Sequence, residues 1–386
     1  MTKTSKLTIV VVDLSVKQTS PAGSCVLSEL LGLSTIHKVH LVASEADENI
    51  KQHVVFHKID APSAPLVLRY MIFSSRVKQK MKKVIKEIDG PYIVQTTQGQ
   101  YVDCTIAYPH FCHRAYLKKH WKNSTITGLR RFSRKLNHLY HSKKESLAFQ
   151  NAKVIVVPSK GLSRELIETY PHCKEKVQVI ANPVDVSYFQ KPLDFDGKKQ
   201  RNALAIGHDE IVIAFAALGD FARKGLPELM GSLLQNEIRD QKFKILVIGG
   251  KANEIDSYKN QAKEMGILKQ MCFVGFQNDI RPYLWMSNIF ALPSLYEIFP
   301  LVCIQAAAAG LPLLASHMHG VEEYLENGKN GWLIERNPKS IAKVLTGITE
   351  GDYNLSKMGE QALETVRQYD HESFRDKWLR LYASFD

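Results

Sequence analysis

Two series of short apolar segments, each alternating with stretches of helical pattern, constrain the fold of this 386-residue chain more than any other feature. Such alternation is typical of βαβ units, whose strands pair in parallel. The first series comprises residues 7–12, 39–42, 92–95, 104–108, 154–157 and 177–180, and the second comprises 211–216, 245–248, 271–274, 289–292, 312–315 and 332–334. We therefore predict an α/β protein built from two doubly wound domains.

A polar segment between the two series predicts the domain boundary. Residues 189–207 are rich in Lys, Asp, Gln and Gly and show no periodicity, which is typical of a linker. The chain is also long enough for two domains of the usual size. We assign residues 1–188 to an N-terminal domain, 189–207 to a linker and 208–369 to a C-terminal domain. A helix at about residues 370–386 is expected to pack back on the N-terminal domain.

Positive charge is concentrated in the first half. Residues 1–192 contain 29 Lys and Arg against 14 Asp and Glu, whereas residues 193–386 contain 22 against 25. The imbalance predicts an anionic partner for the first half. Residues 76–86 and 114–144 are both rich in Lys and Arg interleaved with apolar residues. The first stretch alone is explained by an ordinary amphipathic helix, but the two together favour an anionic membrane surface.

Several classes of protein are disfavoured by the sequence. No apolar run approaches the roughly 18 to 20 residues that span a bilayer, and Asp13 interrupts the apolar run that begins at Leu7. The six cysteines show no CxxC spacing, which argues against a disulfide or zinc framework. A basic nucleic-acid-binding protein remains a distant alternative, although no nucleic-acid module is recognisable. We expect a cytoplasmic protein that lies peripherally on the inner face of the membrane.

Two turns in the second half carry side chains suited to an anionic ligand. Arg223 and Lys224 follow the segment 211–216 and a glycine turn, where they would hold a phosphate at a helix start. Glu297 follows the segment 289–292, just before a helix that begins near Pro300. Free amides of that helix would face a ligand, and Glu297 would accept hydrogen bonds from hydroxyl groups. The alternatives are a solvated basic turn and a carboxylate that caps a helix.

As a set, these motifs resemble the donor domain of the retaining glycosyltransferases of family 4 (glycosyl transferases group 1), which have the GT-B fold. The first half contributes residues 154–159 and 179–185, which resemble the strand-to-linker segment of that family. The resemblance covers almost the whole chain and implies two Rossmann-like domains that face each other across a cleft. The matching motifs in the second half are Lys224-Gly225, Phe273-Val-Gly275, Ser294-x-x-Glu297, the run that ends at Pro312, Gly320-x-x-Glu323 and Asn327-Gly-x-Asn-Gly331.

The resemblance implies transfer of a sugar, of hexose type, from a UDP- or GDP-linked donor. Arg223 and Lys224 would neutralise the donor diphosphate, Glu297 would bind hydroxyls of the sugar, and Gln305 would hold the ribose. Lys224 and Glu297 would thereby act in catalysis. No metal or other cofactor is expected, because protein cations supply the positive charge. The other donor contacts that the resemblance implies are Gly23, Phe273, Val274, Phe299, Pro300, Leu301 and Val302.

The N-terminal domain is expected to bind the acceptor. His110 resembles the active-site histidine of the family, and His113 is the second choice. Imidazole is suited to polarise a hydroxyl group near neutral pH. The expected acceptor is a lipid-linked or cell-surface glycan, as in polysaccharide or lipopolysaccharide synthesis. A small phosphorylated acceptor taken up by a soluble enzyme is the alternative.

Three positions depart from the pattern of the family. Gln305 stands where a carboxylate is usual, Leu218 lies near the place of a frequent arginine, and His319 replaces a glycine. An amide still bonds a ribose hydroxyl, but without the strength that a charge adds. These departures bear on the identity of the donor more than on the fold.

Overall fold

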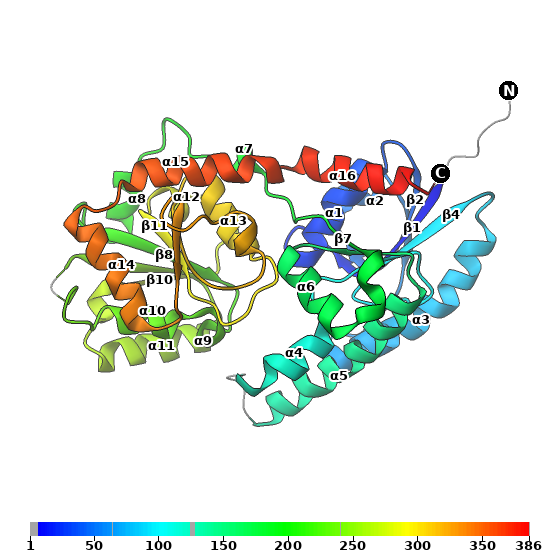
Figure 1. Cartoon of the computed structure of the whole chain (residues 1–386), viewed down its shortest axis with the longest axis horizontal. Helices are drawn as coiled ribbons and strands as arrows, with labels where there is room; N and C mark the ends of the chain where they lie inside the picture. Colours follow the sequence, from blue (N-terminus) through cyan, green and yellow to red (C-terminus); the bar gives the residue numbers. More distant parts are fainter. Residues whose placement is uncertain (1–6, 64, 124–127, 240, 386) are drawn as a thin grey trace. The chain divides into compact units, whose positions relative to one another are not determined.

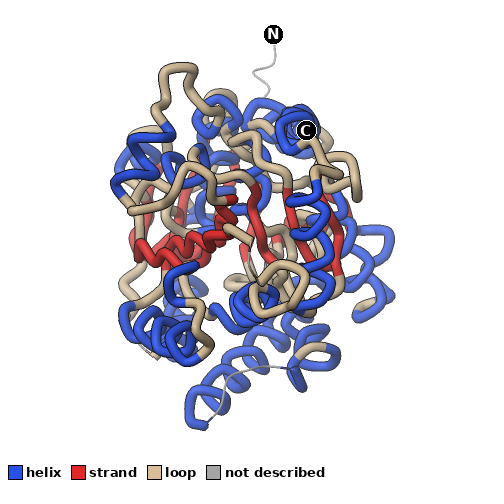
Figure 2. Tube along the Cα trace, turned by 90° about the vertical axis from the view of Figure 1, so that its left-hand side faces the viewer, coloured by secondary structure: helices blue, strands red, loops and turns tan. Residues whose placement is uncertain are grey.

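The computed structural model describes residues 7–63, 65–123, 128–239 and 241–385, and the chain divides into two compact units. The first unit contains residues 1–183 and 371–386, and the second contains residues 184–370. Each unit has one sheet of parallel strands, and helices lie outside the strands (Figures 1 and 2). The predicted α/β class with two doubly wound domains is therefore confirmed.

The first unit is built on a seven-stranded sheet in the order β3-β2-β1-β4-β5-β6-β7. Its strands are β1 (Thr8–Val16), β2 (Lys38–Ala46), β3 (Val55–Lys58), β4 (Tyr92–Thr97), β5 (Ile106–Tyr108), β6 (Val154–Val157) and β7 (Val177–Val179). Its α-helices are α1 (Pro21–Leu33), α2 (Glu48–Lys51), α3 (Leu66–Lys86), α4 (His113–Lys119), α5 (Gly128–Asn151), α6 (Lys160–Thr169) and α16 (His371–Ala383).

The second unit is built on a six-stranded sheet in the order β10-β9-β8-β11-β12-β13. Its strands are β8 (Ile211–Ala217), β9 (Phe243–Gly249), β10 (Met271–Gly275), β11 (Ile289–Leu292), β12 (Leu313–Ser316) and β13 (Gly331–Ile334). Its α-helices are α7 (Val186–Phe189), α8 (Gly197–Ala203), α9 (Phe221–Lys224), α10 (Leu226–Ser232), α11 (Ala252–Glu264), α12 (Arg281–Trp285), α13 (Leu301–Ala308), α14 (Pro338–Glu350) and α15 (Leu355–Val366).

The structure differs from the predicted domain boundaries. The N-terminal unit ends at Pro183 rather than at residue 188, and residues 189–207, predicted as a linker, belong to the second unit. The polar segment contains the helix α8, which belongs to the second unit. Asp196 caps this helix, since its carboxylate accepts the backbone N–H of Lys199 at 2.9 Å. Arg201 then bonds the carbonyl of Met286 and the side chain of Asn288. No residue of α8 is buried, so its sequence lacks the apolar periodicity that reveals a helix.

The terminal helix α16 packs in the first unit, against α1. The hydroxyl of Ser28 lies 2.5 Å from Nδ1 of His371. The hydroxyl of Tyr382 donates to Oε1 of Gln95 at 2.6 Å, and Nε2 of Gln95 donates to the buried carboxylate of Glu29. The first unit is thus completed by a segment that follows the second in sequence. In the described part of the chain, no helix is both long and apolar enough to cross a bilayer.

The strand order of each sheet reverses direction at one point. In the first unit the reversal lies between β1 and β4, and in the second between β8 and β11. The helices that follow such neighbouring strands leave on opposite faces, so the carboxyl ends of the two strands border a crevice suited to a ligand. Functional side chains are therefore expected in the segments that follow β8 and β11 and in those that follow β1, β4 and β5.

Candidate functional site

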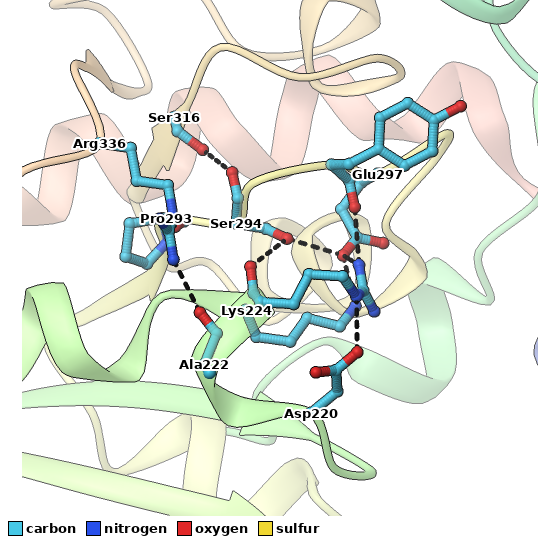
Figure 3. Close-up of polar contacts among 10 residues, drawn as sticks. Asp220, Ala222, Lys224, Pro293, Ser294, Glu297, Ser316 and Arg336 are labelled. Atoms are coloured by element: carbon cyan, nitrogen blue, oxygen red, sulfur yellow. Dashed lines mark hydrogen bonds and ion pairs between the residues drawn. The ribbon is translucent and has the colours of Figure 1, made fainter. Parts of the chain in front are cut away.

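An ion cluster lies at the reversal point of the second sheet (Figure 3). Lys224 Nζ lies 2.6 Å from Oε1 of Glu297, and Arg223 Nη1 lies 2.9 Å from the same oxygen. The hydroxyl of Ser294 also donates to Oε1, at 2.9 Å. Arg223 Nε in turn bonds the carboxylate of Asp220. Two cations from the segment after β8 thus meet one carboxylate from the segment after β11, a pairing that the sequence did not predict.

The charges of this cluster stabilise one another. Burial alone would raise the pKa of Glu297, but Lys224 and Arg223 together outweigh burial and hold its pKa below the ordinary value. Burial likewise opposes the charge on Arg223, and Glu297 with Asp220 restores it and raises the pKa of Arg223. Every hydrogen bond or ion pair of Glu297 with the described residues uses Oε1. Oε2 therefore has no hydrogen-bond partner among the described residues.

The local backbone fixes the two cations beside Glu297. Gly225 ends α9 with φ at +92°, and a Cβ at this position would collide with the carbonyl oxygen of Pro293. Only glycine permits both this conformation and this approach. The backbone N–H of Leu295 donates to the carbonyl of Arg223 at 2.8 Å, and Arg223 Nη1 donates to the carbonyl of Tyr296 at 2.7 Å. Hydrogen bonds to backbone carbonyls therefore hold the segment after β8 against the segment after β11.

Helix α13 presents the other predicted donor residues at the same edge of the sheet. Pro300 is its N-cap and Phe299 is buried just before it. Leu301, Val302 and Gln305 are half-buried, whereas the rest of the helix is buried. Residues four apart lie on the same face of a helix, so Gln305 lies on the face of the first-turn residue Leu301. The first turn of α13 and Gln305 thus lie on the same partly exposed face of the helix.

The predicted base-reading segment ends the edge strand β10. Phe273 pairs with Val247 and Gly275 pairs with Ile248, so the register shifts at Val274. The carbonyl of Val274 accepts a hydrogen bond from Nε2 of Gln277 at 2.7 Å. The predicted recognition of a base through backbone atoms requires N–H and C=O groups that do not take part in the pairing of β10 with β9. Phe273 and Val274 are both half-buried.

The first unit holds Gly23 and the two candidate histidines. Gly23 lies in the first turn of α1, and a Cβ there would collide with the carbonyl of Ser15. His110 follows β5, and its Nε2 atom is buried without a hydrogen-bond partner among the described residues. Burial lowers the pKa of His110 to about 3, so the imidazole is neutral.

His113 has a different environment from His110. Its Nδ1 lies 2.9 Å from Nδ1 of His138, and its ring stacks on that of His141 at 4.6 Å. Burial and both neighbouring histidines hold the pKa of His113 well below its usual value. His113 is therefore engaged inside the unit, whereas Nε2 of His110 has no hydrogen-bond partner among the described residues.

Family models match both halves of the chain. The model described as glycosyl transferases group 1 matches residues 196–365, and the model described as glycosyltransferase family 4 matches residues 32–188. The chain belongs to glycosyltransferase family 4. The predicted family membership is confirmed.

Curated relatives match this family 4 chain over part of their length. It is 29% identical over 206 residues to an uncharacterized glycosyltransferase of Methanocaldococcus jannaschii, which is 52% of each chain. It is 25% identical over 247 residues to the D-inositol 3-phosphate glycosyltransferase of Corynebacterium glutamicum, 62% of this chain and 59% of that protein. The match thus spans about half of the first relative and three fifths of the second.

Solved structures confirm the GT-B fold for almost the whole chain. HepE of Anabaena in complex with UDP has a TM-score of 0.75 at 17% identity, over 98% of this chain and 100% of that one. The lipopolysaccharide glycosyltransferase WaaG has a TM-score of 0.75 at 15% identity, over 97% and 99% of the two chains. Sucrose-phosphate synthase of Thermosynechococcus elongatus has a TM-score of 0.78 at 16% identity, over 98% and 99%.

The sequence missed four side chains that support the site of this family 4 chain. Asp220 bonds Arg223, Ser316 donates to the carbonyl of Ser294, and Arg336 bonds Glu228 together with two backbone carbonyls. Asp220, Ser316 and Arg336 each lie at or just beyond the carboxyl end of a strand, which is the signal that would have revealed them. In the described ranges, no group of three or more His, Cys, Asp or Glu side chains is arranged to hold a metal ion.

Proposed function

We propose that this chain transfers a hexose-type sugar from a UDP- or GDP-linked donor, with retention of configuration. The observation that carries the proposal is the convergence of Arg223 and Lys224 on Glu297 at the reversal point of the second sheet. Two cations beside a helix start suit a diphosphate, and a carboxylate with one available oxygen suits the hydroxyls of the sugar. The family membership and the UDP bound to the structural neighbour HepE support the same chemistry.

The proposed reaction is a displacement on one face of the sugar. The bond between the anomeric carbon and the phosphate oxygen breaks while the acceptor oxygen bonds that carbon from the same side. The departing diphosphate takes the proton of the acceptor hydroxyl. Arg223, Lys224 and the amides that begin α13 stabilise the negative charge that develops on the diphosphate. His110 orients the substrate as a neutral imidazole, and Glu297 holds the sugar.

Binding of nucleotide-sugars tests this function directly. We expect the protein to bind at least one of UDP-glucose, UDP-galactose, UDP-N-acetylglucosamine and GDP-mannose, and to hydrolyse it slowly when no acceptor is present. Isothermal titration calorimetry and release of the nucleoside diphosphate measure the two properties. Absence of binding to the whole panel would contradict the proposal.

We propose further that transfer needs no metal ion, because protein cations take the place that a divalent ion has in other transferases. Activity is then expected to survive EDTA. Loss of activity in EDTA with recovery on addition of Mg²⁺ or Mn²⁺ would overturn this part of the proposal. The nucleotide-sugar is a co-substrate, and no other cofactor is proposed.

For the acceptor, we propose a lipid-linked or cell-surface glycan on the inner face of the cytoplasmic membrane. An E. coli relative, 29% identical over 45% of this chain and 46% of its own, is named for galactosyl transfer to a diphosphoundecaprenol-linked sugar. Helices α3 and α5 lie side by side in the first unit (Figure 1). The first half of α5 exposes a row of apolar residues, namely Leu129 at 89%, Phe132 at 63%, Leu136 at 43% and Leu139 at 48%.

Exposed basic residues lie on the same two helices and favour an anionic lipid surface as the partner of this face. Arg130 and Lys135 are exposed on α5, and Lys78, Lys82 and Lys83 are exposed on α3. Each cation near an anionic surface contributes on the order of 1 kcal/mol. Inserted apolar side chains of this size add roughly 1.5 to 3 kcal/mol each when fully buried. Four cations with two apolar anchors are therefore sufficient for reversible binding.

Co-sedimentation with vesicles of phosphatidylglycerol and phosphatidylcholine tests the docking surface. The double substitution Arg130→Glu and Lys135→Glu should release the protein from these vesicles at low salt, and Leu129→Ser with Phe132→Ser should weaken binding at any salt. Lys259→Glu with Lys263→Glu makes the same charge change on exposed positions of α11 in the second unit and should leave binding unchanged. Equal loss in this control would show that net charge alone governs binding.

A small phosphorylated acceptor is the second candidate. The relatives named D-inositol 3-phosphate glycosyltransferase favour it, since their named acceptor is a phosphorylated cyclitol. This candidate predicts no association of the unmodified protein with anionic vesicles at low salt, while binding of the donor is retained. The vesicle experiment therefore decides between the two acceptors.

A further inference from the structure

Arg336 lies beside the ion cluster but contacts none of its charged side chains. It follows β13 by two residues and enters the segments after β8 and β11 from a third element (Figure 3). Its Nε donates to the carbonyl of Pro293 at 3.0 Å, and its Nη2 donates to the carbonyl of Ala222 at 2.7 Å. Ala222 directly precedes Arg223, and Pro293 directly precedes Ser294. One guanidinium thus bonds a backbone carbonyl in the segment after β8 and another in the segment after β11.

A carboxylate on α10 orients this guanidinium. Glu228 Oε1 lies 2.8 Å from Arg336 Nη1, and Oε2 lies 3.0 Å from Nη2. The pair is bidentate, so it fixes the plane of the guanidinium as well as its position. The side chains of Arg336 and Glu228 are mostly buried, which limits competition from water. With its plane fixed, Arg336 can satisfy both carbonyls only at one separation of the two segments.

We propose that Arg336 is a positioning residue that sets the separation between the Arg223–Lys224 pair and Glu297. It touches neither substrate nor reacting atoms and acts through the carbonyls of Ala222 and Pro293. The inference rests on the proposed function, because the separation matters only if a donor diphosphate and its sugar must be held at once. Lysine cannot replace this arginine, since a single ammonium lacks the planar fork that reaches three partners.

The chain supplies a matched control at the other end of the same two strands. Arg201 bonds the carbonyl of Met286 through Nε, the carbonyl of Glu210 through Nη1 and the side chain of Asn288 through Nη2. Glu210 directly precedes β8 and Asn288 directly precedes β11. Arg201 therefore joins the amino ends of β8 and β11, whereas Arg336 joins the segments that follow their carboxyl ends. Both arginines stabilise the second unit, but only Arg336 lies at the site.

The test compares Arg336→Lys with Arg201→Lys in the full chain. For the nucleotide-sugar that the unmodified protein hydrolyses, we expect Arg336→Lys to lower kcat about tenfold or more, since a displacement of about 1 Å can cost a hundredfold. KM should change less than kcat. Arg201→Lys should lower the melting temperature to a similar extent while kcat stays near that of the unmodified protein. Equal kcat losses in the two variants would reduce Arg336 to a structural role and overturn the inference.

Glu228→Gln provides a second route should Arg336→Lys fail to fold. It keeps the shape of the side chain but weakens the orientation of Arg336, so we expect a smaller loss of kcat in the same direction. When both substitutions are combined, the loss should be less than additive, because the residues act as one unit. Unchanged kcat in a folded Glu228→Gln protein would contradict the inference. Failure of the unmodified protein to bind any nucleotide-sugar would instead overturn the proposed function, and the inference with it.

Discussion

The carboxyl edges of the two sheets share one topology, and burial opposes charge at both, but the net shifts in pKa differ because the ionisable groups have different partners. In the second unit the partners of Glu297 and Arg223 more than offset burial and keep both groups charged. In the first unit, Asp13 and His110 have no ion pair with a described residue that would offset burial. Burial raises the pKa of Asp13, near the end of β1, to about 6 and lowers the pKa of His110 to about 3. The cluster of the second edge therefore stays charged, whereas burial favours the neutral forms of Asp13 and His110 in the first unit.

Removing a charge from the second edge should have the largest effect. Lys224→Ala deletes a contact that strengthens as the diphosphate departs, and we expect transfer to fall roughly a hundredfold, equivalent to about 2 to 4 kcal/mol. Glu297→Gln should be comparably damaging, because it also leaves two partly buried cations without their shared carboxylate. Steady-state rates of transfer or donor hydrolysis measure both effects.

An exposed cation outside the cluster provides the control for these variants. Lys251→Ala removes an exposed lysine that caps α11 in the same unit and should leave the rate near that of the unmodified protein. Near-full activity in folded Lys224→Ala and Glu297→Gln proteins would show that the assigned site is wrong.

Asp13 should give the next largest effect, and on stability rather than rate. Its folded pKa of about 6 lies above the ordinary 3.8. Below pH 3.8 both states are protonated; between 3.8 and 6 only the unfolded state loses its proton, so the free energy of unfolding falls as pH rises. Above about pH 6 the loss is complete and amounts to about 3 kcal/mol. Asp13→Asn should recover up to this amount at neutral pH.

Urea unfolding near pH 4 and near pH 7.5 measures the difference. Asparagine retains an oxygen for the backbone N–H of Ser15, which donates to Asp13 Oδ1 at 2.8 Å. The gain in stability should therefore be present at the higher pH and vanish at the lower. A destabilised Asp13→Asn protein at neutral pH would mean that the carboxylate has an uncounted partner and that the contrast between the two edges is weaker than stated.

The sequence predicted every described strand except β3 and indicated three of the four charged residues of the cluster, for a common reason. Apolar runs mark buried parallel strands, and Arg223, Lys224 and Glu297 lie in the segments that follow such runs, where doubly wound sheets bind ligands. The role of Arg336 could not be predicted in this way, because its partner Glu228 lies 108 residues earlier and only the packing of α10 on α14 brings them together. Helix α8 was missed because its few anchors are polar. What the sequence leaves open is pairing between distant polar residues.

His110 should give the smallest effect and the finest test of the comparison. Because its pKa is about 3, its imidazole stays neutral from pH 5 to 9 and adds no inflection to the rate. His110→Gln keeps a neutral hydrogen-bonding group at the position, so we expect a loss of about tenfold or less with an unchanged shape of the pH profile. The pH profile of kcat/KM, recorded for the unmodified protein and for His110→Gln, measures this loss and the shape of the profile. His113→Gln is the control, because His113 already contacts His138 and His141. An acid limb near pH 6.5 that disappears in His110→Gln would show a histidine that titrates in the working range, and the first edge would then resemble the second in carrying a functional charge.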